Sequence, residues 1–313
     1  MDALTQVEIA ERIDPEIRVG ISATLTAHLP AGDLTVVQIR ELDRRLAVIP
    51  AATGSSEWID RTDGSKLELR HYLPRSLDAS LSRSAILWIH GGGMFLGSAR
   101  QDDALCQELS EALGVRIASV DYRLAPEHPY PEPLDDCYTA LTWLAGRYDR
   151  VVVVGASAGG GLAAGLALLA RDRSGPEIAG VQLWYPMLDD RPTDGARSLA
   201  NTSVWNARLN RLGWQAYLCA AEGDSYAAPA RATDLSGLPP MYLDTGELDL
   251  FLEEDTTFAR RISAAGNSIE FFVAPQAVHA FESLAPDAAI SRETVSRRRA
   301  WLGRILRMDG TAS

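Results

Sequence analysis

Residues 151–170 read V-V-V-V-G-A-S-A-G-G-G-L-A-A-G-L-A-L-L-A and decide the fold of this chain. Four consecutive valines, Val151–Val154, predict a fully buried strand of a parallel sheet, and the small residues of 158–170 predict the helix that follows. The turn between them, 155–159, has the pattern G-x-S-x-G. Such a turn holds its serine at a strained backbone geometry, and small flanking residues let strand and helix pass in contact. The stretch therefore predicts a nucleophile elbow, with Ser157 beside a helix N-terminus.

Two other interpretations of this stretch stay open at this point. A glycine-rich turn can serve only to pack a strand against a helix. A dinucleotide-binding loop has the same setting, but it carries glycine where Ser157 stands, and no G-K-[ST] follows to hold a phosphate. A serine hydroxyl is a poor nucleophile until a base removes its proton, so another part of the chain must supply that base.

The composition limits what the chain binds. With 313 residues, 46% of them hydrophobic, the chain is long enough for one large core and a modest lid. The 42 acidic and 30 basic side chains give a net charge of −12. A surface of that sign repels nucleic acid and anionic membranes, and it disfavours strongly anionic substrates. No motif indicates a metal ion or an organic cofactor.

Cysteine usage and the first residues predict a cytoplasmic protein. Three scattered cysteines are too few for a disulfide framework or a zinc site, and we expect Cys106 and Cys137 to be buried free thiols within helices. Residues 1–12 are acidic and amphipathic, without the basic and apolar segments of a signal peptide. No apolar run reaches the length that a membrane span needs.

Strands alternate with helices over most of the chain, which predicts an α/β fold with a mostly parallel, doubly wound sheet. An antiparallel hairpin is expected at one sheet edge, because Asp63-Gly64 is a turn signal between two strand-like runs. The run Arg297–Arg299 is predicted to be the solvated face of the last helix. The expected strands are 57–60, 66–73, 84–90, 115–121, 151–154, 180–185, 240–244 and 269–273, and the expected helices are about 101–113, 134–145, 158–170, 250–265 and 288–306.

Two segments interrupt this alternation and are predicted to form a helical lid. The N-terminal segment has two apolar stripes at helical spacing, within 7–17 and 36–46, which predicts two short amphipathic helices. The later segment contains polar turns and a tryptophan-containing helical stretch, 205–219. The predicted division is therefore two cap segments, 1–50 and 187–236, around one catalytic domain formed by 51–186 and 237–313.

Of the five histidines, His279 is expected to be the base for Ser157, because it follows the last strand at the same sheet edge as the elbow. His28 lies in the first cap segment, His71 on an edge strand and His128 among prolines. His90 begins a glycine loop, which it is better placed to brace than to reach the serine. The base needs a buried carboxylate to hold its tautomer. Glu247 and Asp249 both lie on the loop after the strand that contains Asp244, and spacing alone does not choose between these two.

An acyl-transfer site also needs backbone N–H groups that point at the developing oxyanion, without side chains in the way. The sequence His-Gly-Gly-Gly at 90–93 follows a predicted strand and offers such a bare backbone. Gly92 and Gly93, together with Ala158 just after the serine, are the predicted oxyanion donors. The order serine, acid, histidine along the chain is that of the α/β-hydrolase fold.

With these residues in place, the chain resembles the hormone-sensitive-lipase-like family of carboxylesterases, a group within the α/β hydrolases. The resemblance covers most of residues 85–281. Its three specific motifs are H-G-G-G-M-F at 90–95, D-Y-R-L-A-P-E-H-P-Y-P at 121–131 and G-A-S-A-G-G at 155–160, and two weaker ones are D-L-F-L-E-E at 249–254 and H-A-F at 279–281.

The resemblance implies an eight-stranded sheet with a helical cap, and it favours Asp249 over Glu247 as the acid, because the family's acid precedes a D-x-L-x-D-E block. It implies hydrolysis of small acyl esters, with acyl chains of roughly C2 to C8. Members of this family often pair through their last strand and helix, so the resemblance also implies a homodimer of that kind. Met94, Trp205, Leu209 and Trp214 are the candidate residues of an apolar acyl slot.

The sequence departs from the family pattern in places that remove no catalytic atom. Ala156 stands before the serine where many relatives carry Asp or Thr, and Phe251 and Glu253 alter the acid block slightly. Ala280 replaces the usual glycine after the histidine, which is tolerable if its φ stays below zero. One ion-pair scaffold is predicted beneath the oxyanion loop, formed by Asp121, Arg123 and Glu127.

These residues together predict a serine carboxylesterase that uses Ser157, His279 and Asp249. The alternative from another class is a catalytically silent hydrolase fold that serves as a small-molecule receptor, like the plant gibberellin receptors that the family resembles. Those receptors lack the catalytic histidine, and His279 is present here. A serine peptidase is disfavoured because no additional domain restricts access to the site.

Overall fold

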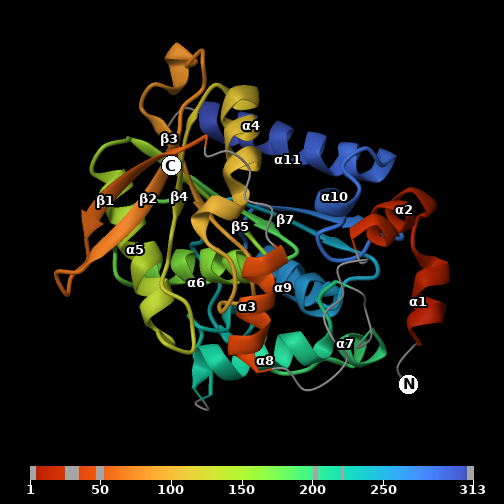
Figure 1. The fold of residues 1–313 in the computed structure, drawn as a ribbon. Helices are drawn as coiled ribbons and strands as arrows, with labels where there is room; N and C mark the ends of the chain where they lie inside the picture. The colour runs from red at the N-terminus through yellow and green to blue at the C-terminus, as the bar shows by residue number, and fades with distance from the viewer. Residues whose placement is uncertain (1–4, 25–34, 47–52, 200–203, 220–221, 309–313) are drawn as a thin grey trace.

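The computed structural model describes residues 5–24, 35–46, 53–199, 204–219 and 222–308. Within them, the core is one eight-stranded sheet with the strand order β1-β2-β4-β3-β5-β6-β7-β8 (Figure 1). Strands β3 to β8 pair in parallel, and β1 and β2 join antiparallel at one edge. The predicted α/β-hydrolase fold is therefore confirmed. The strands are β1 (Ser55–Asp60), β2 (Lys66–Tyr72), β3 (Ser84–Ile89), β4 (Arg116–Val120), β5 (Arg150–Ala156), β6 (Gly180–Trp184), β7 (Met241–Gly246) and β8 (Ile269–Ala274).

Helices cover both faces of this sheet. On one face lie α4 (Asp103–Leu113) and α11 (Ala289–Arg307), and on the other lie α5 (Glu132–Ala145), α6 (Ala158–Asp172) and α9 (Leu252–Ala264) (Figure 1). Side chains alternate between the faces along a strand, and here both sides are buried. In β5, Val151 and Val153 pack toward the α5–α6 face, while Val152 and Val154 pack toward the α4–α11 face. This double burial explains why the strand is an unbroken run of valines.

The N-terminal helices number three in the described residues, α1 (Gln6–Arg12), α2 (Pro15–Thr24) and α3 (Val36–Leu46), where the sequence predicted two. The first apolar stripe is split because Asp14 accepts hydrogen bonds from the N–H groups of Glu16 and Ile17, which starts a new helix at Pro15. The stripe itself is real, since Ile9, Ile13 and Ile17 are buried in one cluster.

Residues 187–236 contain α7 (Asp194–Ser198) and α8 (Ala207–Leu218) in place of a strand–helix repeat. Helix α8 packs against the glycine loop after β3, because a Cβ on Gly213 would stand 2.8 Å from the carbonyl oxygen of Gly93. Helix α3 reaches the same loop, where Arg40 Nε donates to the Phe95 carbonyl at 2.6 Å. The division of the chain into a catalytic domain and two cap segments stays a prediction.

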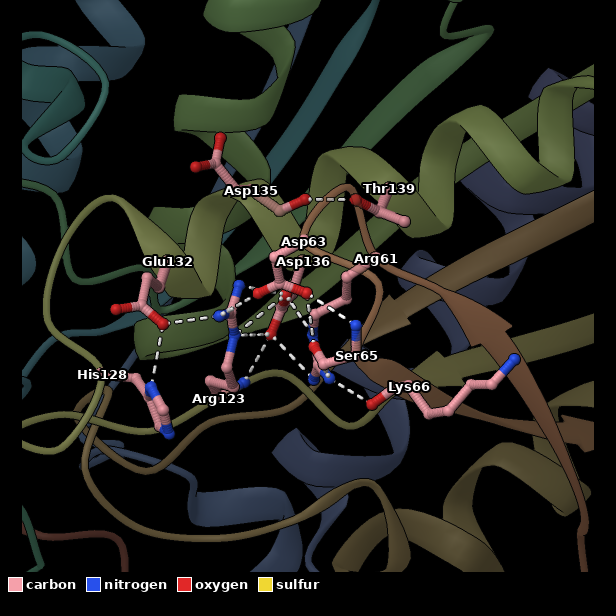
Figure 2. A network of polar contacts seen from close by, with 10 residues as sticks. All are labelled: Arg61, Asp63, Ser65, Lys66, Arg123, His128, Glu132, Asp135, Asp136 and Thr139. Carbon is pink, nitrogen blue, oxygen red and sulfur yellow. Dashed lines mark hydrogen bonds and ion pairs between the residues drawn. The ribbon is translucent and has the colours of Figure 1, made fainter.

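The expected scaffold of Asp121, Arg123 and Glu127 is wrong, because these side chains do not pair with one another. Arg123 instead donates hydrogen bonds to Asp136 and Glu132 of α5 (Figure 2). Asp136 also accepts a hydrogen bond from Arg61, the residue after β1. Asp121 accepts the Ala99 N–H at 2.7 Å, and Glu127 pairs with Arg40 at 2.5 Å. The three charges thus tie the loop after β4 to three different neighbours.

The expectation for Arg297–Arg299 is wrong at its central residue. The side chain of Arg298 is 1% exposed, whereas Arg297 is exposed and Arg299 is half-buried. Successive helix residues lie about 100° apart, so three adjacent arginines cannot all face solvent on a packed helix. Arg298 falls on the stripe of α11 that faces the sheet, with Trp301, Leu302 and Ile305.

The cysteine prediction is confirmed for the two helical residues: Cys106 and Cys137 are buried and free, and Cys219 is free and exposed. No helix in the described ranges is both long and apolar enough to cross a membrane. Strand β8 forms the sheet edge opposite β1, and Phe271 on it is partly exposed. A homodimer through β8 and α11 stays a prediction.

Candidate active site

Ser157 lies at the junction of β5 and α6 with φ 56° and ψ −119°, a conformation that L residues rarely adopt. The turn is this tight because strand and helix meet through small residues. A Cβ on Gly159 would stand only 2.1 Å from the carbonyl oxygen of Ile89, so no larger residue fits there. The Ser157 N–H donates to the Trp184 carbonyl at 2.8 Å, which ties the strained residue to β6.

His279 lies in the loop after β8 and contacts Ser157. The distance from its Nε2 to Ser157 Oγ is 3.0 Å, and the distance from its Nδ1 to Asp249 Oδ2 is 2.8 Å. Both distances are within hydrogen-bonding range, and all three side chains are at least nine-tenths buried. The structure thus brings together the serine and histidine selected from the sequence, with a carboxylate on the far side of the imidazole.

Of the two acids on the loop after β7, the structure places Asp249 against the histidine. The other oxygen of Asp249, Oδ1, accepts the Phe251 N–H at 3.0 Å, which fixes the carboxylate. Glu247 points elsewhere: its carboxylate accepts the Gln276 N–H at 2.9 Å and stands 3.6 Å from Arg12. Its side chain is 43% exposed, so it lies at the surface rather than beside the buried imidazole.

Three aromatic rings surround the His279 imidazole. Tyr185 meets it edge-on with ring centroids 4.7 Å apart, Phe251 does so at 5.3 Å, and Trp205 lies 6.5 Å away. Tyr185 follows β6 with φ 36°, another strained residue at the carboxyl edge of the sheet. These rings hold the imidazole in one orientation and exclude water from it.

The glycine loop that carries two of the predicted oxyanion donors approaches the serine through Gly91, where a Cβ would stand 3.3 Å from Ser157 Cβ. Gly92 and Gly93 have φ of 122° and 61°, the left-handed region that glycine tolerates. Within the part of the chain that the structure describes, no hydrogen bond uses the N–H groups of Gly92, Gly93 or Ala158. Behind this loop, His90 stacks on Tyr122 with ring centroids 4.1 Å apart, so it braces the loop as the sequence suggested.

Trp205 and Arg40 pack tightly against the glycine loop. A Cβ on Gly93 would stand 2.3 Å from the Trp205 ring, and that ring also packs against Phe95. Arg40 of α3 holds the same loop through the Phe95 carbonyl and pairs with Glu127. Sequence reasoning missed Arg40, because an arginine on an amphipathic helix gives no signal of a partner 55 residues away.

The four candidate slot residues occupy different places. Trp214 lines a cavity of about 580 Å³ beside α8, together with Leu218 and Leu250, the residue after Asp249. Trp205 lies over the glycine loop, and Leu209 and Met94 are buried in the main core cluster. Among the described residues, no three His, Cys, Asp or Glu side chains come together as a metal site would require.

Two further buried carboxyls, Glu254 and Asp255, lie on α9 behind Asp249. Burial raises the pKa of Glu254 well above its usual range, although the N–H groups of Leu188 and Asp189 donate to it. Burial, with the negative charges of Glu254 and Asp249, raises the pKa of Asp255 in the same direction. Neither side-chain oxygen of Asp255 has a hydrogen-bond partner among the described residues. Asp255 therefore costs stability whenever it is ionised.

We expect Asp255→Asn to flatten the loss of stability that accompanies a rise in pH. An acid whose pKa is higher in the folded than in the unfolded protein contributes its full stability below the unfolded-state pKa. That contribution falls by about 1.4 kcal/mol per pH unit until the pH has passed the folded-state pKa. Asparagine cannot ionise, so the variant should gain about 1 kcal/mol or more over wild type between pH 5 and pH 9. Urea unfolding at several pH values measures this, and Asp287→Asn, at an exposed site, should leave the slope unchanged. Parallel pH curves for Asp255→Asn and wild type would contradict it.

Ala280 was expected to replace glycine without strain if its φ stayed below zero, and the structure does not meet this condition. Its φ is 54°, in the left-handed region, where an alanine Cβ is strained. It lies between His279 and the short helix α10 (Phe281–Leu284), where the chain reverses direction sharply. The reversal lets His279 face Ser157 while Phe281 enters the core beneath it.

Comparisons with known proteins agree with this arrangement. The sequence profile of a family described as having the alpha/beta hydrolase fold matches residues 86–283. A curated relative, carboxylesterase NlhH of Mycobacterium tuberculosis, is 31% identical and aligns with 94% of this chain and 96% of its own.

Solved structures of similar proteins superpose over nearly the whole chain. A bacterial heroin esterase is 33% identical with a TM-score of 0.84, covering 95% of this chain and 99% of its own. Esterase LipW of Mycobacterium marinum is 32% identical with a TM-score of 0.81, covering 95% and 96%. With the elbow, the glycine loop and the histidine loop at one sheet edge, these likenesses show that the chain belongs to the hormone-sensitive-lipase-like family of the α/β hydrolases.

Proposed function

We propose that this chain, a carboxylic ester hydrolase, cleaves short- to medium-chain acyl esters with Ser157 as the nucleophile, His279 as the base and Asp249 as the acid. The observation that carries the proposal is the continuous contact from Ser157 Oγ to His279 Nε2 at 3.0 Å and from His279 Nδ1 to Asp249 Oδ2 at 2.8 Å. A serine so paired can lose its proton as it attacks.

The reaction would proceed through an acylated serine. His279 Nε2 takes the Ser157 proton while Oγ forms a bond to the ester carbonyl carbon. The resulting imidazolium gives that proton to the alkoxy oxygen, the carbon–oxygen bond breaks, and the alcohol leaves. A water molecule then attacks the acyl carbon, again with His279 as the base, and its proton returns to Ser157 as the carboxylic acid departs. Asp249 holds Nδ1 protonated throughout.

The oxyanion would be bound by the N–H groups of Gly92, Gly93 and Ala158. Free N–H groups next to the nucleophile support this, because donors already in place need no reorganisation when charge develops on the carbonyl oxygen. Loss of one such donor typically raises the barrier by about 2.7–4 kcal/mol. The helix N-terminus of α6 adds a favourable dipole at the same point.

An apolar acyl group fits the surroundings of the serine. Trp205 and Phe251 face His279. Trp214 lines a cavity of about 580 Å³ that reaches Leu250, the residue after Asp249, and whose lining does not include Ser157 or His279. Pockets of this size take small organic ligands. The tight packing of Trp205 over Gly93 supports short chains over long ones, because a long chain would have to displace the ring.

Two measurements test this proposal. A fluorophosphonate probe should label the wild-type protein at Ser157 and leave Ser157→Ala unlabelled, because the probe forms its bond only with an activated serine. Rates for p-nitrophenyl esters from C2 to C16 should be highest at roughly C2 to C8. Absence of labelling would favour the receptor alternative, and a maximum at C12 or longer would contradict the proposed substrate range.

A further inference from the structure

A buried charge cluster lies next to Tyr185, whose ring packs on His279. Its centre is Arg298 of α11, whose side chain is 1% exposed. The guanidinium donates through Nε and Nη2 to the two oxygens of Asp244 in β7, at 2.6 and 2.8 Å. Through Nη1 it donates to Glu282 Oε1 in α10 at 2.7 Å. This arginine is almost completely buried, although the sequence places it within a basic run.

The cluster is joined to the imidazole through Tyr185. Its hydroxyl donates to Glu282 Oε1 at 2.7 Å, and its ring meets the His279 ring edge-on at 4.7 Å. Glu282 also follows His279 by three residues, in the first turn of α10. Glu282 is therefore connected to the imidazole in two ways. It lies three residues after His279 in the chain, and it bonds the tyrosine whose ring packs on the imidazole.

The cluster carries one net negative charge, from two carboxylates and one guanidinium. Burial raises the pKa of Asp244, and the Arg298 guanidinium opposes this rise. Both oxygens of Asp244 accept N–H groups from the arginine, as an ionised carboxylate does. Burial acts to raise the pKa of Glu282, but the Arg298 guanidinium and the Tyr185 hydroxyl hold that pKa below its usual range. Glu282 Oε2 has no hydrogen-bond partner among the described residues, so nothing there neutralises it further.

We propose that Glu282 and Arg298 are positioning residues for His279, and that the net charge of their cluster stabilises the imidazolium that forms when Ser157 loses its proton. This proposal rests on the proposed function. A buried charge acts over several ångströms because little solvent screens it. Of the titratable or charged groups near the imidazole, Ser157, Tyr185 and Asp249 contact it. The others lie behind these contacts: Glu282, Arg298 and Asp244 beyond Tyr185, and Glu254 and Asp255 on α9 beyond Asp249.

The sign of the expected effect follows from these charges. Of the groups around His279, Asp249 bonds the imidazole directly and remains in every variant proposed below. Removal of the negative charge of Glu282 makes the imidazolium less stable, so its proton is lost at lower pH. For two unit charges at an effective dielectric constant of about 20, Coulomb's law corresponds to about 1.2 units of pH at ~10 Å and about 0.6 unit at ~20 Å.

The test is the pH profile of kcat/KM for Glu282→Gln and Glu282→Asp. Glutamine keeps an oxygen that can accept from Arg298 and Tyr185 but removes the charge, whereas aspartate keeps the charge and shortens the side chain. We expect Glu282→Gln to move the acid midpoint down by about half a unit to one unit and to lower kcat several-fold. We expect Glu282→Asp to lower kcat and keep the wild-type midpoint. Equal midpoints in Glu282→Gln and wild type would overturn the proposal.

A control and a second variant keep the test sharp. Arg299 lies on α11 next to Arg298, and its exposed partner is Glu108 of α4. Glu108→Gln removes this exposed charge and should leave both kcat and the acid midpoint of kcat/KM unchanged. Tyr185→Phe keeps the ring on His279 and removes only its bond to Glu282. Tyr185→Phe should lower kcat several-fold and keep the acid midpoint of kcat/KM. A wild-type kcat in this variant would overturn the positioning role, and this result does not depend on whether Glu282→Gln folds.

Failure of this proposal can be told apart from failure of the proposed function. Fluorophosphonate labelling of wild type is measured first, on the same preparation. If wild type is not labelled, the proposed function fails. If wild type is labelled and the profile of Glu282→Gln superposes on it, only the positioning proposal fails.

Discussion

Replacement of Ser157 by alanine is expected to lower kcat for p-nitrophenyl butyrate by a factor on the order of 10⁴ or more. The variant keeps the glycine loop and the cap, so it should still bind substrate. It has no oxygen within reach of His279 Nε2, and the acylated intermediate cannot form. Initial rates with stopped-flow or long-incubation assays measure the residual turnover, and thermal unfolding checks that the variant remains folded.

A matched control comes from another buried serine. Ser119 in β4 is fully buried and has no side-chain partner among the described residues, so Ser119→Ala should keep wild-type kcat. Residual activity of Ser157→Ala near the wild-type level would mean that the nucleophile lies elsewhere. That outcome would remove the basis for every role proposed for His279 and Asp249.

Asp249→Asn is expected to lower kcat by a factor on the order of 10⁴, while Glu247→Gln should change it by less than about twofold. An asparagine amide can donate to Nδ1, which would place the imidazole proton on Nε2 and leave no lone pair to accept from Ser157. Among the residues that the structure describes, Glu247 accepts the Gln276 N–H and approaches Arg12, both at the surface. Steady-state kinetics of the two variants against the same ester gives the comparison.

The two acid variants also test which carboxylate is the partner in solution. A large loss in Glu247→Gln with little change in Asp249→Asn would reassign the acid and contradict the 2.8 Å contact as the working arrangement. Comparison of fluorophosphonate labelling rates separates activation of the serine from deacylation, since labelling needs only the first. We expect Asp249→Asn to be labelled much more slowly than wild type.

The sheet and its crossovers could be predicted because their signals are local. A run of valines, a turn with glycine at 155 and 159, and the alternation of strands with helices each depend on neighbours within a few residues. The break between α1 and α2 was also local, at Asp14 and Pro15, but a continuous apolar stripe concealed it. The sequence pattern predicted that this segment is helical, but it did not predict the boundary between α1 and α2.

The candidate site divides in the same way. Ser157 could be selected from its turn, and His279 from its place after the last strand. Between Glu247 and Asp249 the residues gave no choice, because both lie on one loop and both carry a carboxylate. The choice depends on which side chain the loop buries, and that is set by the packing of Phe251 and Leu250 into the core.

By itself, the sequence determined the α/β-hydrolase fold and the serine at the strained turn, because short-range patterning and the need for small residues leave few other solutions. The family resemblance favoured Asp249 over Glu247, and the tertiary structure showed the contact of Asp249 with His279. Only the tertiary structure decided that Ala280 takes a positive φ and that Arg298 is buried between Asp244 and Glu282. Arg298 and Asp244 are 54 residues apart, and His279 and Ser157 are 122 apart. Contacts over such separations arise from the way sheet and helices pack together, which no local pattern records.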